Sequence, residues 1–189
     1  YWLPPILVAF RRLYPDIEID LAISNTLDAA SRVRDGEAEM GIVEGVVDDP
    51  ALAQWPLGED HLTIIQSDPQ FPRTISRTWL CAAQWVVREQ GSGTRAALER
   101  YLAGLGIALQ EINISLVLPS NEAVRAAIEA GAGIGALSSL VVAPSLLAGT
   151  LHAVPQTLST RAFYGLRYKE CYRSQAADAL LELIAQHKS

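Results

Sequence analysis

The stretch SNTLDAASRVRDGEAEMGIVEG (residues 24–45) combines a helix pattern, a stop signal and a strand pattern, in that order. Apolar residues of Leu27–Val33 recur at helical spacing behind Ser24-Asn25-Thr26, which offer a helix cap. Gly36 suits the end of this helix, because glycine readily adopts the left-handed conformation found there. Met40–Val43 is a short apolar run of the kind that a buried parallel strand shows. The stretch therefore predicts an α/β fold.

The residues before and after this stretch continue the same alternation. Ile6–Leu13 has helical periodicity, and the proline of Tyr14-Pro15 predicts its end. In Ile17–Ile23 isoleucine and leucine alternate with acidic residues and alanine, which predicts a strand with one buried face. Leu62–Ile65 predicts a further strand. The first part of the chain thus has the order of elements typical of a doubly wound sheet.

The second part of the chain repeats this order after the polar segment Ser67–Thr78. We expect strands at Trp85–Val87, Ile112–Leu116, Ile134–Leu137 and Phe163–Tyr168, and helices around Leu98–Leu105, Val124–Ile128, Leu140–Leu147 and Ala177–Ile184. Ser67–Thr78 and Leu151–Thr160 are the candidate crossovers between two lobes. We therefore expect two α/β lobes with a cleft between them, lobe I comprising residues 1–67 and 160–189 and lobe II residues 68–159.

Composition excludes several classes of protein. Of the 189 residues 50% are hydrophobic and 19% are charged, a balance that argues against disorder. The formal net charge of −6 lacks the basic footprint of a nucleic-acid binder, so any DNA-binding part is expected outside this chain. No secretory signal pattern begins the chain. Ala130–Thr160 contains no Asp, Glu, Lys or Arg, but glycines and prolines interrupt it, so buried strand and helix are expected rather than a membrane span.

Three strand-to-helix turns carry small hydroxyl or amide residues: Ser24-Asn25-Thr26, Gly91-Ser92-Gly93-Thr94 and Ser120-Asn121. In open α/β sheets such turns lie where ligands bind, and the unpaired amides of a helix N-terminus attract anions. Glu44, directly after a predicted strand, is expected to face the same cleft, and Arg95 is a candidate counter-charge for the ligand. The plainer interpretations are helix capping for the turns, a solvated loop carboxylate for Glu44, and an exposed helix position for Arg95. Together the turns predict a site for a polar or anionic ligand.

No residue pattern indicates catalysis, a metal or a cofactor. Gly91–Thr94 lacks the spacing of a Walker A loop, and neither a GxSxG nor an HExxH motif occurs. The histidines are scattered, and the two cysteines are isolated, so we expect reduced thiols and no metal site. These residues are His61, His152, His187, Cys81 and Cys171. We expect a protein that is not an enzyme.

Several stretches, taken in order, resemble the effector-binding domain of LysR-type transcriptional regulators. They are Leu3-Pro4-Pro5, Phe10–Pro15, Leu27–Val43, Glu44–Pro50, Leu57–Asp60, Arg88–Arg95 and Ala130–Gly135. Glu39 stands where the family usually has aspartate. The stretches from Glu44 to Arg95 are most similar to the CysL-like subgroup. The resemblance covers nearly the whole chain.

The resemblance implies a two-lobed, periplasmic-binding-protein-like (type 2) fold, with a mixed sheet in each lobe and a small inducer bound between the lobes. It implies that the three turns contact this inducer. It also implies a preceding winged helix-turn-helix that binds DNA, a preceding strand and turn that complete the pocket, and a cytoplasmic protein without membrane contact. Homodimers or tetramers are implied, with the helix of Ile6–Leu13 and the strand Ile17–Ile23 packed against a partner's second lobe.

Two other functions fit the same pattern. A solute-binding protein of a transport system shares the fold and the anion-binding turns, but predicts a secretory signal or lipid anchor and a monomer. A small transferase could use Gly91–Thr94 to hold phosphate, although the chain offers no acid and base pair for such a reaction.

Overall fold

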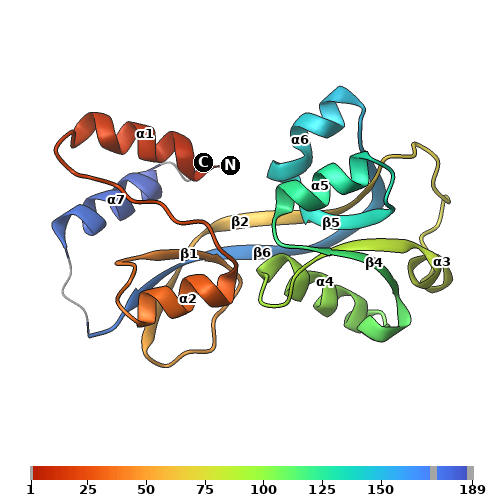
Figure 1. Cartoon of the computed structure of the whole chain (residues 1–189), viewed down its shortest axis with the longest axis horizontal. Coiled ribbons are helices and arrows are strands. Elements are labelled where there is room, and N and C mark those ends of the chain that lie inside the picture. Colours follow the sequence, from red (N-terminus) through yellow and green to blue (C-terminus); the bar gives the residue numbers. More distant parts are fainter. Residues whose placement is uncertain (1, 171–173, 187–189) are drawn as a thin grey trace. The chain divides into compact units, whose positions relative to one another are not determined.

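The structure is a computed structural model that describes residues 2–170 and 174–186. Its helices are α1 (Leu3–Leu13), α2 (Thr26–Arg34), α3 (Arg77–Ala82), α4 (Gly93–Gly104), the 3₁₀ turn η1 (Leu109–Glu111), α5 (Asn121–Glu129), α6 (Ser139–Ala148) and α7 (Gln175–Gln186). Its strands are β1 (Gly41–Glu44), β2 (Leu52–Gln66), β3 (Gln84–Arg88), β4 (Asn113–Leu118), β5 (Ile134–Ser138) and β6 (His152–Tyr168). The predicted α/β character is confirmed (Figure 1).

The chain divides into two compact units. Unit 1 comprises Tyr1–Glu59 and Ala162–Ser189, and unit 2 comprises Asp60–Arg161. The chain therefore passes from one unit to the other inside the long strands β2 and β6. The strands follow the hydrogen-bonded order β1-β6-β2-β5-β3-β4. The lobe limits expected from the sequence, at residues 67 and 160, lie near these passages, and the lobe assignment itself stays a prediction.

In unit 1, α1 forms where helical periodicity was expected. Prolines occupy its first positions, where a missing amide hydrogen costs nothing, and Ile6 and Phe10 are buried against α7 and β2 side chains. The amide of Tyr14 bonds to the carbonyl of Phe10 and closes the helix before Pro15. α1 thus covers the same apolar cluster as α7.

The strand predicted at Ile17–Ile23 is wrong. These residues form no helix and no ladder with any described strand, and Ile23 is 91% exposed. Ile17 and Ile19 still pack partly buried on the cluster of α1 and α7. Alternation therefore marked a partly buried face only at Ile17 and Ile19, since Leu21 is 50% exposed. A strand also needs a neighbour that accepts and donates its backbone hydrogen bonds.

Residues 24–45 form α2 and β1, the helix and strand predicted from their sequence. Ala30 and Val33 are buried, while Leu27, expected on the same face, is exposed. Gly36 has a φ of 77°, the left-handed conformation that ends the helix. β1 pairs antiparallel with β6, so the parallel pairing suggested by its apolar run is wrong. Its apolar character reflects burial under α2 instead.

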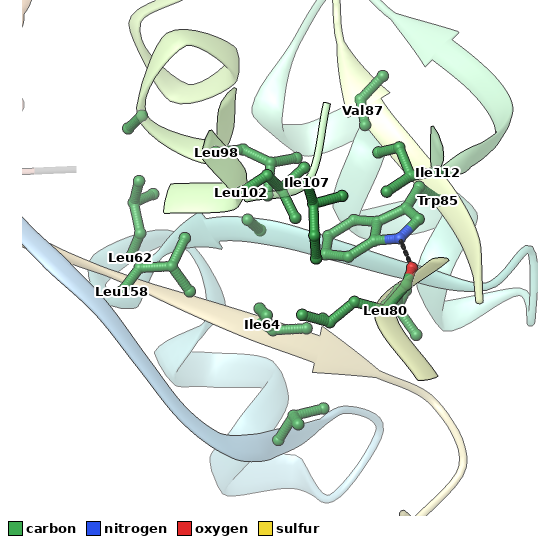
Figure 2. Close-up of a cluster of buried hydrophobic side chains, with 14 residues drawn as sticks. Leu62, Ile64, Leu80, Trp85, Val87, Leu98, Leu102, Ile107, Ile112 and Leu158 are labelled. Atoms are coloured by element: carbon green, nitrogen blue, oxygen red, sulfur yellow. Dashed lines mark hydrogen bonds between the residues drawn. The ribbon is translucent and has the colours of Figure 1, made fainter. Parts of the chain in front are cut away.

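In unit 2, neighbouring residues of each central strand face opposite sides of the sheet. Ile64 of β2 and Trp85 of β3 join a cluster with α3 and α4, whereas Ile65 and Val86 join a cluster with α5 and α6. In the first cluster the indole nitrogen of Trp85 donates to the carbonyl of Leu80 at 2.8 Å (Figure 2). β3 is parallel to β4 and β5, and β5 is antiparallel to β2, so the sheet is mixed.

The stretch Ala130–Thr160, which lacks charges, forms β5, α6 and the first part of β6, so the expected buried strand and helix are present. The strand expected at Phe163–Tyr168 begins already at His152, within the segment expected to be a crossover. Gly133 has a φ of 129°, and a Cβ there would lie 2.2 Å from the carbonyl oxygen of Gln84, so only glycine fits against β3. Across residues 2–170 and 174–186, no helix is long and apolar enough to cross a bilayer.

Candidate functional site

The turn between β3 and α4 buries two of the predicted site hydroxyls. Gly91 has a φ of 90°, which turns the chain sharply after the strand. Ser92 is the N-cap of α4, but its side chain makes no capping hydrogen bond. Ser92 is 3% exposed and Thr94 is 2% exposed. The first turn of α4 therefore combines backbone amides that have no acceptor within the helix with two buried hydroxyls.

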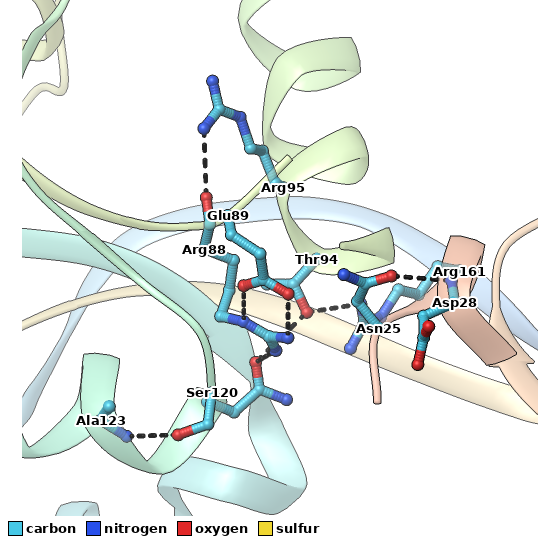
Figure 3. Close-up of polar contacts among 10 residues, drawn as sticks. Asn25, Asp28, Arg88, Glu89, Thr94, Arg95, Ser120, Ala123 and Arg161 are labelled. Atoms are coloured by element: carbon cyan, nitrogen blue, oxygen red, sulfur yellow. Dashed lines mark hydrogen bonds and ion pairs between the residues drawn. The ribbon is translucent and has the colours of Figure 1, made fainter. Parts of the chain in front are cut away.

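The start of α5 lies beside the start of α4. Ser120 caps α5 by accepting a hydrogen bond from the amide of Ala123 at 3.0 Å (Figure 3). The next residue, Asn121, lies within 3.5 Å of Thr94, measured between the amide oxygen Oδ1 and the hydroxyl oxygen. The structure thus brings two of the predicted turns together. In the turn before α4 the N-cap hydroxyl makes no capping hydrogen bond, whereas in the turn before α5 it does.

A buried ion pair that the sequence patterns do not predict holds Thr94. The Nε and Nη2 atoms of Arg161 donate to Oδ2 of Asp60 at 3.0 and 2.8 Å, and Nη1 donates to the Thr94 hydroxyl at 3.0 Å. Ser138 donates to the other oxygen of Asp60 at 2.9 Å. Asp60 and Arg161 are 2% and 5% exposed. Burial of such a pair is tolerated because the carboxylate and the guanidinium each gain several charge-assisted hydrogen bonds.

One sequence signal pointed to this pair. Arg161 is the first charged residue after the stretch Ala130–Thr160. A lone arginine that follows so long an uncharged run is a candidate for burial with a partner, because charged residues are almost never buried unpaired. The identity of that partner, 101 residues earlier, could not be read from the sequence.

A second buried guanidinium lies at the end of β3. Arg88 forms a two-pronged pair with Glu89, with distances of 2.8 and 3.0 Å (Figure 3). Its Nη1 atom donates to Oδ1 of Asn121 at 2.5 Å. Arg95, considered as a counter-charge for a ligand, instead pairs with Glu99 on its own helix and donates to the carbonyl of Arg88. No local sequence pattern indicates this role of Arg88.

The remaining predicted residues lie in unit 1. Asn25 caps α2 by accepting from the amide of Asp28 at 3.0 Å, and Ser24 is exposed. The hydroxyl of Thr26 donates to the carbonyl oxygen of Glu44 at 3.4 Å. The structure therefore joins the first turn to the end of β1. That these residues bind the same ligand as unit 2 stays a prediction.

No grouping of metal ligands stands out in the part of the chain that the structure describes: no three His, Cys, Asp or Glu side chains are placed to hold an ion. Cys81 is a free thiol of α3, partly buried against the core of unit 2. Cys171 and His187 lie outside the described residues. The donors gathered at α4 and α5 suit a ligand that accepts hydrogen bonds.

Comparison with known proteins supports the expected fold. A family model described as LysR substrate binding domain matches residues 1–189. The regulatory domain of CcmR from Synechocystis PCC6803, solved in complex with 2-PG, has a TM-score of 0.86 and 25% identity; the match covers 98% of this chain and 90% of that one. The expected fold class, an α/β fold of the periplasmic-binding-protein-like type 2 kind, is confirmed.

Two curated transcriptional regulators match in sequence. The HTH-type regulator YeiE of Escherichia coli (strain K12) is 30% identical over 186 residues, which cover 96% of this chain and 62% of that protein. The HTH-type regulator CysL of Bacillus subtilis (strain 168) is 34% identical over 151 residues, which cover 78% of this chain and 49% of that protein. The chain thus spans less than two thirds of these relatives.

Proposed function

Because this chain belongs to the LysR substrate-binding domain family, we propose that it senses a small polar or anionic effector and reports it to a DNA-binding domain. Ser92, Thr94 and Asn121, with the turn between β3 and α4, bind the effector in unit 2. In unit 1 the proposed contacts come from Ser24–Thr26 and Glu44. Unit 1 and unit 2 are taken as the two lobes of the family fold.

The observation that carries this proposal is the state of the α4 N-terminus. A helix start that served only stability would use its serine as a cap. Ser92 instead leaves its hydroxyl out of the capping position although it is buried, and Thr94 beside it is fixed by Arg161. The helix dipole and the first-turn amides favour negative charge at this point. The complex of the CcmR regulatory domain with 2-PG, on a similar fold, supports a small-molecule ligand.

The regulator function rests on the family and on the two relatives named as transcriptional regulators. In this proposal the effector changes the populations of two arrangements of the whole regulator, and the difference in effector affinity between them sets the size of the response. The protein acts in the cytoplasm, has no catalytic activity and associates with copies of itself. Exposed apolar residues Val8, Leu13, Leu21 and Ile23 support self-association, which sedimentation velocity can measure.

Calorimetric titration with inorganic sulfate, inorganic phosphate and 2-PG tests the site. Each probe that binds the chain is then titrated into Ser92→Ala and Thr94→Ala variants. A hydrogen bond to a charged group contributes about 1.5–3 kcal/mol, so we expect roughly tenfold or greater loss of affinity. The control is Ser76→Ala, because Ser76 caps α3 in the same unit and its hydroxyl accepts from Trp79. Unchanged affinity in both variants would show that the site is misplaced.

The transport alternative makes a different prediction about the gene. A helix-turn-helix and a linker helix encoded upstream of Tyr1 support the regulator, whereas an upstream secretory signal supports an exported binding protein. Sequencing that region separates the two functions without knowledge of the ligand.

A further inference from the structure

Unit 1 contains a small pocket formed by residues that the proposed function does not use. Its lining includes Met40 before β1, Trp55 of β2, Arg167 of β6 and Leu181 of α7. β1, β6 and β2 are neighbours in the sheet, and α2 and α7 pack against opposite faces of these strands (Figure 1). With the solvent at its opening the pocket has a volume of about 260 Å³, below the roughly 300–1,000 Å³ of sites for drug-sized ligands. The pocket therefore suits a small molecule.

Gly165 of β6 allows the Trp55 ring to lie directly on that strand. A Cβ at Gly165 would lie 2.5 Å from two carbon atoms of the indole, so a larger residue would displace the ring. Alternate residues of a strand point to the same face, which places Arg167 on the side of β6 that carries Trp55. Leu166, between Gly165 and Arg167, is buried on the side of α2. The sequence of β6 thus brings a guanidinium and an indole ring into one pocket.

Arg167 differs from the other arginines whose Nε atom is buried without a hydrogen bond. Arg32 and Arg125 each form an ion pair, with Glu37 and Glu129 respectively. Arg167 has no hydrogen-bond or ion-pair partner among the residues that the structure describes. A buried donor without an acceptor costs free energy, and such groups are nearly always paired in native proteins. The Arg167 guanidinium is therefore open to the anionic group of a ligand.

A ligand with one carboxylate and an apolar body matches the groups of this pocket. A carboxylate accepts two parallel hydrogen bonds from a guanidinium, and the first turn of α7, at the positive end of the helix dipole, adds to the attraction. Met40, Trp55 and Leu181 offer apolar surface to the rest of the ligand. Glu39 and Asp178 also line the pocket, and their negative charges disfavour a second charge on the ligand. These groups favour a monocarboxylate over a dicarboxylate or sulfate.

We propose that this pocket is a second ligand site, in which Arg167 binds the carboxylate of a small apolar monocarboxylate and Trp55 contacts its apolar body. Such a ligand joins β6 to the start of α7, and because it binds only the folded chain it stabilises unit 1. The site is independent of the effector contacts proposed above, because it shares no residue with them.

Calorimetric titration of the 189-residue chain with matched probes tests the chemistry of the site. Phenylacetate carries one carboxylate on an aromatic body, phenylacetamide has the same shape without the charge, and phenylmalonate adds a second carboxylate. We expect phenylacetate to bind roughly tenfold or more tightly than the other two, because only phenylacetate supplies a single charged acceptor. Equal affinities for phenylacetate and phenylacetamide, or no binding of phenylacetate, would overturn the proposal.

Arg167→Met removes the charge and keeps an unbranched side chain. We expect about tenfold weaker phenylacetate binding, because hydrogen bonds to a charged group are lost. The melting temperature of the ligand-free chain should stay the same or rise, since the variant removes a partly buried charge that has no described partner. The matched control is Arg125→Met, which breaks the ion pair with Glu129 in unit 2 and should lower the melting temperature without changing phenylacetate affinity. Unchanged phenylacetate affinity in Arg167→Met would overturn the proposal.

Tryptophan emission locates the ligand. Phenylacetate should change the emission of the unchanged chain, and this change should be absent in Trp55→Phe, although the other three tryptophans remain. No change in the unchanged chain, or a change that persists in Trp55→Phe, would mean that the ligand does not contact Trp55, and would overturn the proposal. Phenylacetate binding that weakens in Thr94→Ala but not in Arg167→Met would also overturn it, and would leave the proposed function of the unit 2 residues standing.

Discussion

The helices α2 and α4 begin with similar sequences, SNT (residues 24–26) and SGT (residues 92–94), but use them differently. At α2 the asparagine caps its own helix, and the threonine donates to a carbonyl oxygen 18 residues away. At α4 the serine makes no cap, and the threonine is buried against Arg161, which is 67 residues away. Similar short motifs thus have different partners. In unit 1 the motif caps its own helix, and in unit 2 it is held by Arg161 of β6.

One charged pair of each unit shows the same difference. In unit 1, Arg34 pairs with the adjacent Asp35, and both side chains are about half exposed. In unit 2 the pair of Arg161 with Asp60 joins β6 to β2 and is almost completely buried. Exposed local pairs contribute little to stability, whereas a buried pair is costly to break. The difference indicates that the polar groups around α4 are held in one arrangement.

The largest effect is expected from Asp60→Ala. This change leaves the Arg161 guanidinium buried without its carboxylate and weakens its hold on Thr94. Removing one partner of a buried pair costs about 3–5 kcal/mol. We expect a loss of that size in the free energy of unfolding, measured by urea denaturation.

The matched control is Glu37→Ala in unit 1, which breaks an exposed pair with Arg32. We expect a loss of less than about 1 kcal/mol. Similar losses for Asp60→Ala and Glu37→Ala would remove the energetic distinction between the two units.

Local sequence patterns were sufficient for most of the fold. Apolar periodicity predicted α1, α5, β3 and β5, because burial on one helix face or in a central strand leaves a regular pattern. It failed at Ile17–Ile23, where pairing depends on a neighbouring strand and not on the residues themselves. It also misjudged the direction of β1, because an antiparallel strand buried under a helix can be as apolar as a parallel one.

In the candidate site, too, local features could be predicted and long-range contacts could not. Gly91–Thr94 and Ser120-Asn121 could be identified because glycine turns and helix caps are local features. The grouping of Asp60, Ser138 and Arg161 could not be identified, since the uncharged run before Arg161 suggests its burial but nothing in the sequence indicates which residues the fold places beside it. The helix starts were therefore predictable, and the groups that control their hydrogen bonding were not.

A smaller effect on the free energy of unfolding is expected at the N-caps of α5, α2 and α4. Ser120→Ala and Asn25→Ala each remove a cap acceptor, and we expect each to lower the free energy of unfolding by about 1 kcal/mol. Ser92→Ala removes no capping bond and should cost only a few tenths of a kcal/mol on the same scale. Urea denaturation of the three variants measures this order. A Ser92→Ala loss as large as the other two would mean that Ser92 serves as an ordinary cap.

The smallest effect concerns the other end of α5, where Glu129 extends the long-range polar contacts of unit 2. Ser145 donates to Glu129 at 2.6 Å, and this hydrogen bond, with further contacts from Thr150 and Arg125, lowers the pKa of the Glu129 carboxyl. A lowered pKa in the folded state stabilises the protein above the unfolded value of about 4.3, and that contribution is lost as the pH falls through the folded value.

Glu129→Gln removes this pH-dependent contribution. The difference in urea midpoint between the unchanged chain and Glu129→Gln should be constant near neutral pH and shrink below about pH 4.3. Ser145→Ala removes the largest cause of the shift and should reproduce part of the change. A difference that persists undiminished at about pH 3 would show that the carboxylate charge contributes nothing, and that this long-range contact of unit 2 acts only through the shape of the side chain.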